Sequence, residues 1–137
     1  MQKPTVMKKL TLIIATLLFL TGHTKAQTVN IIDFGAVPDG VTVNTSFIQK
    51  AIDSISTRGG GTVFVPSGVF ITGTIELKSN VNLYLETGAE IKGSPDINDY
   101  KVCKAVNYDL THYGILYSHQ ANNISITGQG AINGNEE

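Results

Sequence analysis

The sequence has 137 residues, of which 42% are hydrophobic and 15% charged, values that fit one small folded domain and exclude a disordered chain. It contains 14 glycines and no tryptophan, which is typical of a β architecture rich in turns. All 11 acidic residues follow residue 26, whereas only 6 of the 10 basic residues do, and they form no basic run. We therefore expect no nucleic-acid partner.

The first 26 residues have the three-part layout of a secretory signal peptide. Three lysines give a positive start, an apolar run follows at 10–20, and small residues occupy positions −3 and −1 of a cleavage site, Thr24 and Ala26. The run is too short for a membrane-spanning helix, which needs about 20 apolar residues. We predict cleavage after Ala26, so that residues 1–26 are removed. The mature chain is then secreted or periplasmic, with no membrane association after cleavage.

A short strand is expected first in the mature chain, at 29–34, because Val, Ile and Phe predominate there. Turns follow at Gly35 and at 38–40, where proline, aspartate and glycine are adjacent. Asp33 and Asp39 could pair as an acid and a base. Both flank these glycine turns, however, and hydrogen bonding within the turns explains them.

An amphipathic helix is expected at about 46–58. Ser46 and Gln49 have the spacing of a capping box, and Gly59 can end the helix in a left-handed conformation. The glycines at 59–61 follow a helix instead of leading into one, so we interpret them as a helix-to-strand turn and not as a phosphate-binding loop. One apolar stripe at helical spacing is formed by Phe47, Ile48, Ala51, Ile52 and Ile55.

The remainder of the sequence predicts short strands between turns, with a polar inserted loop at 94–113 that lacks periodicity. The clearest alternation is at 81–85, where Val and Leu face one side and polar residues the other. Further strands are expected at 62–65, 69–71, 74–77, around 91, and at 115–117, 123–126 and 131–132.

A weak internal repeat links 80–93 with 123–134. Both segments have asparagine, apolar, polar and apolar residues in succession, and then Gly-Ala, isoleucine and glycine. Such recurrence indicates stacked coils, since each coil buries its apolar face only against its neighbour. A solenoid of this kind needs a cover at its first end, and the amphipathic helix at 46–58 has the position and the single apolar face for that role.

These segments resemble the pectate-lyase-like superfamily in the motifs DFGA at 33–36 and GGGTVFVPSG at 59–68. They resemble glycoside hydrolase family 28 more narrowly in GTIELKSNV at 73–81, GSPD at 93–96 and ITGQGAING at 126–134. The resemblance implies an all-β fold, the right-handed parallel β-helix, whose N-terminal coils would be formed by residues 27–137. It also implies inverting hydrolysis of pectic polysaccharide, polygalacturonan or rhamnogalacturonan, by a monomeric enzyme.

The resembled family uses aspartates from Asn-Thr-Asp and Asp-Asp motifs, together with Gly-His-Gly and Arg-Ile-Lys motifs. None of these occurs in the sequence, and Asn44-Thr45-Ser46 is not the aspartate motif. We therefore assign no catalytic, cofactor-binding or metal-binding residue and expect no cofactor. The catalytic residues are expected downstream of this chain, which would be a fragment or a truncated product and inactive alone.

Two alternatives stay open. The chain could belong to a non-catalytic carbohydrate-binding or structural β-helix module, or to a lyase or epimerase acting on uronate polymers. A downstream aspartate pair would favour hydrolysis, whereas a calcium-binding carboxylate cluster with a basic residue would favour a lyase.

Several residues permit a functional interpretation beside an ordinary one. Cys103 has no disulfide partner, and we expect a partly buried side chain in preference to a nucleophile. Asp96 and Asp99 could bind calcium, but no recognised loop surrounds them. His112 and His119 lack zinc spacing, and we place them on a solvated loop, although a loop beside a sugar cleft also fits.

The five tyrosines could stack on sugars, but packing in the core or at its rim is the preferred interpretation; they are Tyr84, Tyr100, Tyr108, Tyr113 and Tyr117. Two glycosylation sequons begin at Asn44 and Asn123, and they matter only in a host that glycosylates.

Overall fold

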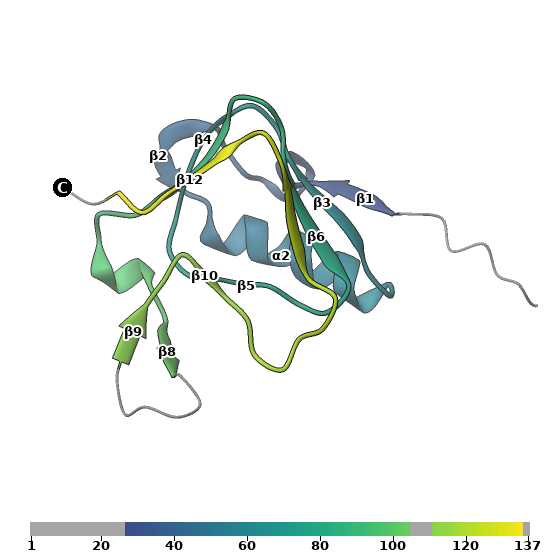
Figure 1. Ribbon diagram of the computed structural model, residues 1–137. Helices are drawn as coiled ribbons and strands as arrows, with labels where there is room; N and C mark the ends of the chain where they lie inside the picture. Colours follow the sequence, from purple (N-terminus) through teal and green to yellow (C-terminus); the bar gives the residue numbers. More distant parts are fainter. Residues whose placement is uncertain (1–26, 105–110, 136–137) are drawn as a thin grey trace, which may run out of the picture.

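The computed structural model describes residues 27–104 and 111–135, and the predicted signal peptide at 1–26 lies outside the described residues (Figure 1). The chain winds in successive turns, and strands from neighbouring turns pair in parallel. The predicted parallel β-helix is confirmed. The strands of the first sheet, sheet A, are β1 (Thr28–Asn30), β3 (Gly61–Val65), β6 (Val81–Leu85) and β11 (Ser125–Gly128).

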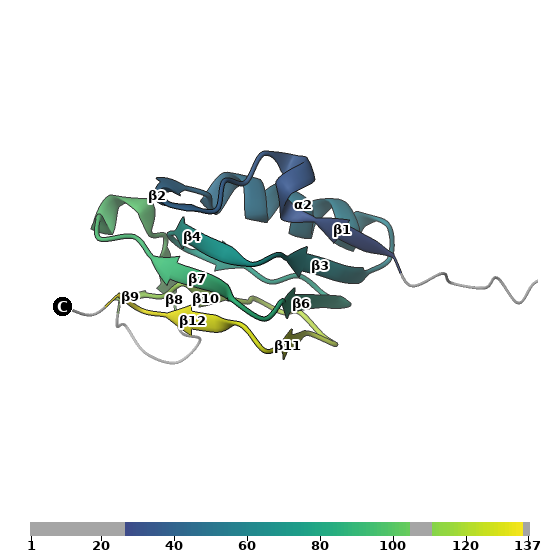
Figure 2. The same ribbon diagram turned by 90° about the horizontal axis from the view of Figure 1, so that it is seen from above.

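Two further parallel sheets form the other sides of the coils. Sheet C contains β5 (Ile75–Glu76) and β10 (Leu116–Tyr117). Figure 2 shows the coils as layers, with β1 and β2 in the first layer and β11 and β12 in the last. The strands of sheet B are β2 (Asp39–Val43), β4 (Gly68–Thr72), β7 (Ala89–Gly93) and β12 (Ala131–Asn133).

The helix α2 (Thr45–Thr57) takes the place of a strand in the first turn and covers that end of the stack (Figure 2). Four of the five residues of the predicted stripe are buried, and Phe47 is partly buried; the four are Ile48, Ala51, Ile52 and Ile55. They pack against inward residues of sheet A such as Val63, Val65 and Leu83. The predicted capping helix is therefore confirmed, with its bounds shifted by one residue.

The two ends of α2 differ in how well the sequence predicted them. The capping box is wrong, because Asn44 precedes the helix and the Gln49 side chain contacts the backbone of Glu76 instead. At the other end, Gly59 is left-handed with φ 97°. The N–H groups of Gly59 and Gly60 donate to the carbonyls of Ser56 and Ile55, the two bonds of a Schellman motif.

The predicted strand at 29–34 is wrong in its second half. The chain leaves sheet A after Asn30, whose side chain accepts a hydrogen bond from the N–H of Ile32 and starts the 3-10 helix η1 (Ile31–Phe34). Gly35 ends that helix with φ 101°. The turn predicted at 38–40 leads directly into β2, a strand that the sequence patterns did not indicate, since its exposed and half-buried residues alternate without a buried one.

The segment 94–113, predicted as a loop, contains short regular elements. These are the 3-10 helix η2 (Ile97–Asp99) and the antiparallel strands β8 (Val102–Lys104) and β9 (Thr111–Tyr113). Each has three residues, too few to show a period. The hairpin lies beside the β-helix and adds no strand to its three sheets (Figure 1).

The predicted repeat corresponds to neighbouring coils. Asn80 and Asn123 both adopt the left-handed conformation, with φ 63° and 57°, and the amide of Asn123 donates to that of Asn80 at 3.0 Å. Beyond them Ile126 lies opposite Leu83, and Ile132 opposite Ile91. Equivalent residues therefore stack, and the small slips within the repeat fall in the turns.

Candidate functional site

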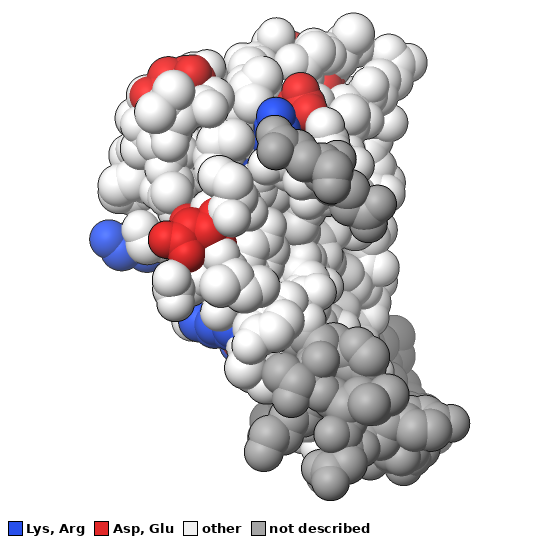
Figure 3. Space-filling model, turned by 90° about the vertical axis from the view of Figure 1, so that its left-hand side faces the viewer, with Lys and Arg blue, Asp and Glu red and all other residues white. Residues whose placement is uncertain are grey.

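A groove of about 630 Å³ follows the outer face of sheet B, between the turn that leads into β2 and the loop 94–101. Figure 3 views the side of the molecule on which this loop lies, and there the charged side chains are scattered among uncharged ones. The groove is lined by Gly40, Val41, Val43, Ile71, Lys92, Ser94, Pro95, Asp96, Asp99 and Asn135.

The floor of the groove results from the register of sheet B. Ile71 lies opposite Val43 on one side and Lys92 on the other, and Lys92 in turn lies opposite Asn133. Because side chains alternate across a strand, the next residue on β7, Ile91, is fully buried in the core while Lys92 faces outward. The floor is thus apolar over the first coils and polar over the later ones.

The wall of the groove is the loop 94–101, and its carboxylates have roles within the loop. Asp96 accepts hydrogen bonds from the backbone and side-chain amides of Asn98, at 2.9 and 2.7 Å, and so caps η2. Asp99 accepts one from the hydroxyl of Ser94. In the described part of the chain, no three His, Cys, Asp or Glu residues are placed to hold a metal ion. The calcium hypothesis therefore has no ligand cluster in this part.

Asp39 is engaged in its turn, as the sequence predicted. Its carboxylate accepts from the N–H groups of Val41 and Thr42 and from the Thr42 hydroxyl, at 2.7–2.9 Å. These bonds, that of the Thr42 N–H above all, lower the pKa of Asp39 below its ordinary 3.8. Such a carboxylate does not hold a proton to give to a leaving group at neutral pH. Asp33 is exposed in η1.

The other candidate residues are not brought together at one site. His119 is exposed in the turn between sheets C and A, and the side chain of His112 lies outside the described residues, as does Tyr108. Cys103 is a free, partly buried thiol, as predicted. Tyr84 is 37% exposed, and it stacks on Phe64 with ring centroids 5.9 Å apart, so one of its ring faces packs along sheet A.

The match to a family model covers almost all of the residues that follow position 26. Residues 28–134 match the family model of the rhamnogalacturonase A/epimerase, pectate lyase-like proteins. The chain belongs to this family. An exo-poly-alpha-D-galacturonosidase of Dickeya chrysanthemi is 40% identical over 120 residues, which are 80% of this chain and 20% of the relative.

Solved structures of relatives have the same fold as this member of the rhamnogalacturonase A/epimerase family. The family 28 exopolygalacturonase of Yersinia enterocolitica has a TM-score of 0.74 and 37% identity over 81% of this chain and 21% of that chain. A mannuronan C5-epimerase of Azotobacter vinelandii is 42% identical over 62 residues, 39% of this chain and 4% of the relative. The chain thus spans about one fifth of the length of the two galacturonan-active relatives.

The groove of this family member has polar and charged side chains beside an apolar floor. It offers an ammonium group, amide and carboxylate groups, and an apolar floor, a mixture that suits a sugar chain. Inverting hydrolysis requires a free acid and a free base on opposite sides of the bond, whereas both groove carboxylates hold the loop. The sequence patterns did not identify Lys92 as a groove residue. Only its outward position, next to buried Ile91, could have indicated it.

Proposed function

We propose that this chain forms the N-terminal coils of a secreted glycoside hydrolase that cleaves polygalacturonan or rhamnogalacturonan by inversion. The observation that carries the proposal is the match of residues 28–134 to the family model, supported by 40% identity to an exo-poly-alpha-D-galacturonosidase. The two catalytic carboxyl groups would come from coils that follow the coil containing Asn133.

The test is an assay of the complete secreted protein on polygalacturonate and on rhamnogalacturonan. We expect new reducing ends, and a first-formed product whose anomeric configuration, followed by NMR, is inverted relative to the substrate. Residues 27–137 produced alone should release none. Unsaturated product ends would contradict hydrolysis and show a lyase, and turnover by the short chain that depends on one of its own aspartates would contradict the placement of the catalytic groups.

An epimerase is the second candidate, because a mannuronan C5-epimerase is 42% identical to this chain over 62 residues. That match covers 39% of the chain, against 80% for the galacturonosidase. Conversion of polymannuronate without chain cleavage, detected by NMR of the polymer, would favour the epimerase over the hydrolase.

Export is proposed from the layout of residues 1–26. No helix within the described ranges is long and apolar enough to cross a membrane. N-terminal sequencing of the exported protein should start at Gln27, and Ala26→Trp should prevent cleavage there, because the site accepts only small residues. Retention of Met1 in the exported wild-type protein would contradict the proposal.

A further inference from the structure

The strand β2 forms one edge of sheet B in the described chain. The order of this sheet is β12-β7-β4-β2, so β2 pairs with β4 on one side only, and it lies in the first layer of the coils (Figure 2). An edge strand presents N–H and C=O groups with which a strand of another molecule can pair. The side chains around β2 therefore determine whether this edge is open or closed.

The outer face of β2 carries apolar side chains beside one carboxylate. Exposed and half-buried residues alternate along the strand, and the exposed ones are Asp39, Val41 and Val43. The exposed fraction is 78% for Val41 and 40% for Val43. Exposed valines on an unpaired edge favour edge-to-edge pairing, whereas a charge on the same edge opposes it.

Three backbone groups of β2 are hydrogen-bonded to nearby side chains. The Asp39 carboxylate accepts from the N–H groups of Val41 and Thr42, at 2.9 and 2.7 Å, and from the Thr42 hydroxyl. The Thr42 carbonyl accepts from the Asn44 amide at 2.7 Å. The two N–H groups are therefore engaged already and are not free to donate to an incoming strand.

The same part of β2 departs from a regular ladder. Asp39 lies opposite Val69 and Val43 opposite Ile71, so four residue steps along β2 correspond to two along β4. Inside this bulge Gly40 has φ 69°, a left-handed conformation that suits glycine. The Asp39 carboxylate bonds to the N–H groups of the bulge, and a bulged edge strand pairs poorly with a straight one.

We infer that Asp39 keeps the β2 edge closed against pairing with the same strand of a second copy. The second copy is the partner that fits, because an antiparallel pair centred on Val41 places valine against valine and residue 39 against Val43. An apolar residue at position 39 would complete an apolar row. The aspartate places a charge against Val43 and holds the N–H groups that the pair would need. This role does not depend on the substrate of the protein.

The experiment measures the mass of the secreted protein by light scattering over a range of concentrations at neutral pH. Asp39→Ala frees the two N–H groups and removes the charge, and we expect its dimer dissociation constant to be about tenfold lower than that of wild type. Asp39→Asn keeps an oxygen that can accept from both groups, so it should associate less than Asp39→Ala. Asp33→Ala, an exposed carboxylate of η1, removes the same charge elsewhere and should behave as wild type.

Lysine variants locate the new contact. Added to Asp39→Ala, Val41→Lys should return association to the wild-type level, because a lysine on an edge strand disfavours a second strand. Ile132→Lys lies at the opposite edge of sheet B. Measured against Ile132→Lys alone, the gain caused by Asp39→Ala should be unchanged. A gain that persists with Val41→Lys, or that disappears with Ile132→Lys, would overturn the inference.

Hydrogen exchange separates pairing at β2 from association of unfolded chains. In Asp39→Ala, exchange at the amides of Val41 and Thr42 should slow as the concentration rises, because pairing gives these groups new acceptors. Amides that stay unprotected in the associated variant would show that it associates elsewhere or through unfolding, and would overturn the inference. So would an Asp39→Ala variant that associates no more than wild type, or an Asp39→Asn variant that associates as strongly as Asp39→Ala.

Discussion

Asn44 is a buried amide whose hydrogen bonds shape the first turn of the fold. It is 0% exposed; its oxygen accepts from the N–H of Val37 at 2.7 Å, and its nitrogen donates to the carbonyls of Val37 and Thr42. The same residue begins a glycosylation sequon, but its nitrogen has no room for a glycan. The structural use of Asn44 therefore excludes the modification in the folded protein.

We expect Asn44→Ala to lower the free energy of unfolding by about 2–3 kcal/mol, because it leaves buried backbone groups without partners. Asn30→Ala is the matched control, since Asn30 makes a single cap bond to Ile32 and its loss should cost about 1 kcal/mol. Urea titrations of both variants measure the difference. Equal midpoints would show that the three bonds of Asn44 add nothing beyond a surface cap.

Asp39 makes stability depend on acid pH. Its pKa in the folded protein is below 3.8 because Thr42 and Val41 donate hydrogen bonds to its carboxylate. A carboxyl group with a depressed folded-state pKa stabilises the protein above its unfolded pKa, and this contribution is lost as the pH falls through the folded pKa. We expect Asp39→Asn to unfold at lower urea than wild type at pH 7 and at nearly equal urea at pH 2. A difference that does not change with pH would contradict this origin.

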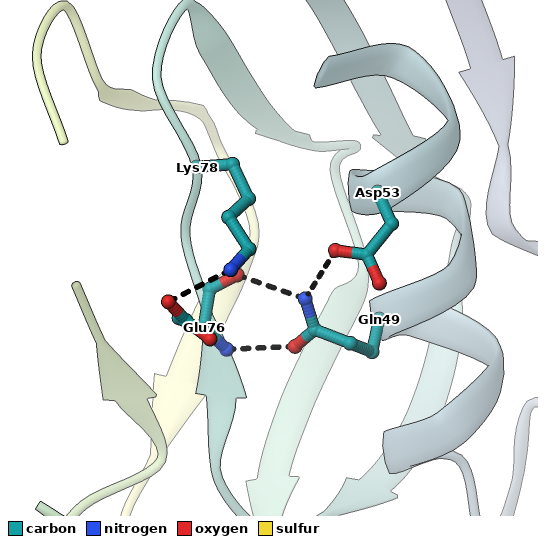
Figure 4. A network of polar contacts seen from close by, with 4 residues as sticks. All are labelled: Gln49, Asp53, Glu76 and Lys78. Atoms are coloured by element: carbon teal, nitrogen blue, oxygen red, sulfur yellow. Dashed lines mark hydrogen bonds and ion pairs between the residues drawn. The ribbon is translucent and has the colours of Figure 1, made fainter. Parts of the chain in front are cut away.

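At the scale of elements, the helix α2 completes sheet C by means of one side chain (Figure 4). In a parallel strand, alternate N–H groups point to opposite neighbours. On β5 the N–H groups of Ile75 and Leu77 donate to the coil that contains β10, while that of Glu76 points toward the helix. Gln49 accepts from this N–H at 2.8 Å and donates to the Glu76 carbonyl at 3.1 Å. Its amide thus takes the part of a backbone peptide in a strand.

We expect Gln49→Ala to cost about 1–3 kcal/mol, since both backbone groups of Glu76 lose their partners. Gln49→Glu should also destabilise, because its second oxygen would face the Glu76 carbonyl and the carboxylate of Asp53. The control is Asp53→Ala, an exposed change that removes only the outer bond to Gln49 and should cost under about 1 kcal/mol. Thermal unfolding at neutral pH compares the three, and a Gln49→Ala variant as stable as Asp53→Ala would contradict this role.

The helix and strands that the sequence predicts best are those whose pattern of apolar residues reflects burial in the core. The stripe through Ile48 and Ile55 reports burial directly, and the alternation in 81–85 does so for a strand, so α2 and β6 were predicted closely. The partner of a polar side chain is harder to predict than its burial. The Gln49 amide could bond with its own helix end, but in the structure it bonds with the backbone of Glu76, 27 residues away. The groove was not predictable, because its floor consists of residues from four coils, and only the register of sheet B brings these residues together.

At the scale of the whole described chain, the first and the last of its coils are unlike. The first end is covered by α2, whose outer face carries exposed charged residues such as Lys50 and Asp53. The last coil has no such cover in the described chain: residues 111–135 contain no Asp, Glu, Lys or Arg. Ile126 and Ile132 lie opposite the buried residues Leu83 and Ile91 of the preceding coil, yet they are 46% and 42% exposed. Edge strands that remain in contact with water usually carry charges, so this end has the composition of an interface.

We therefore expect residues 27–137, produced alone, to associate through the last coil as their concentration rises. The unpaired edges of β11 and β12 and the apolar groups beside them favour edge-to-edge pairing. Ile126→Lys should reduce association, because a lysine at this edge disfavours a second strand while its chain can still reach water. Val41→Lys is the control, since Val41 is apolar and 78% exposed but lies at the opposite edge of sheet B. Light scattering after size-exclusion chromatography measures the mass, and a wild-type chain that stays monomeric at all concentrations, or equal effects of the two lysines, would contradict association at this end.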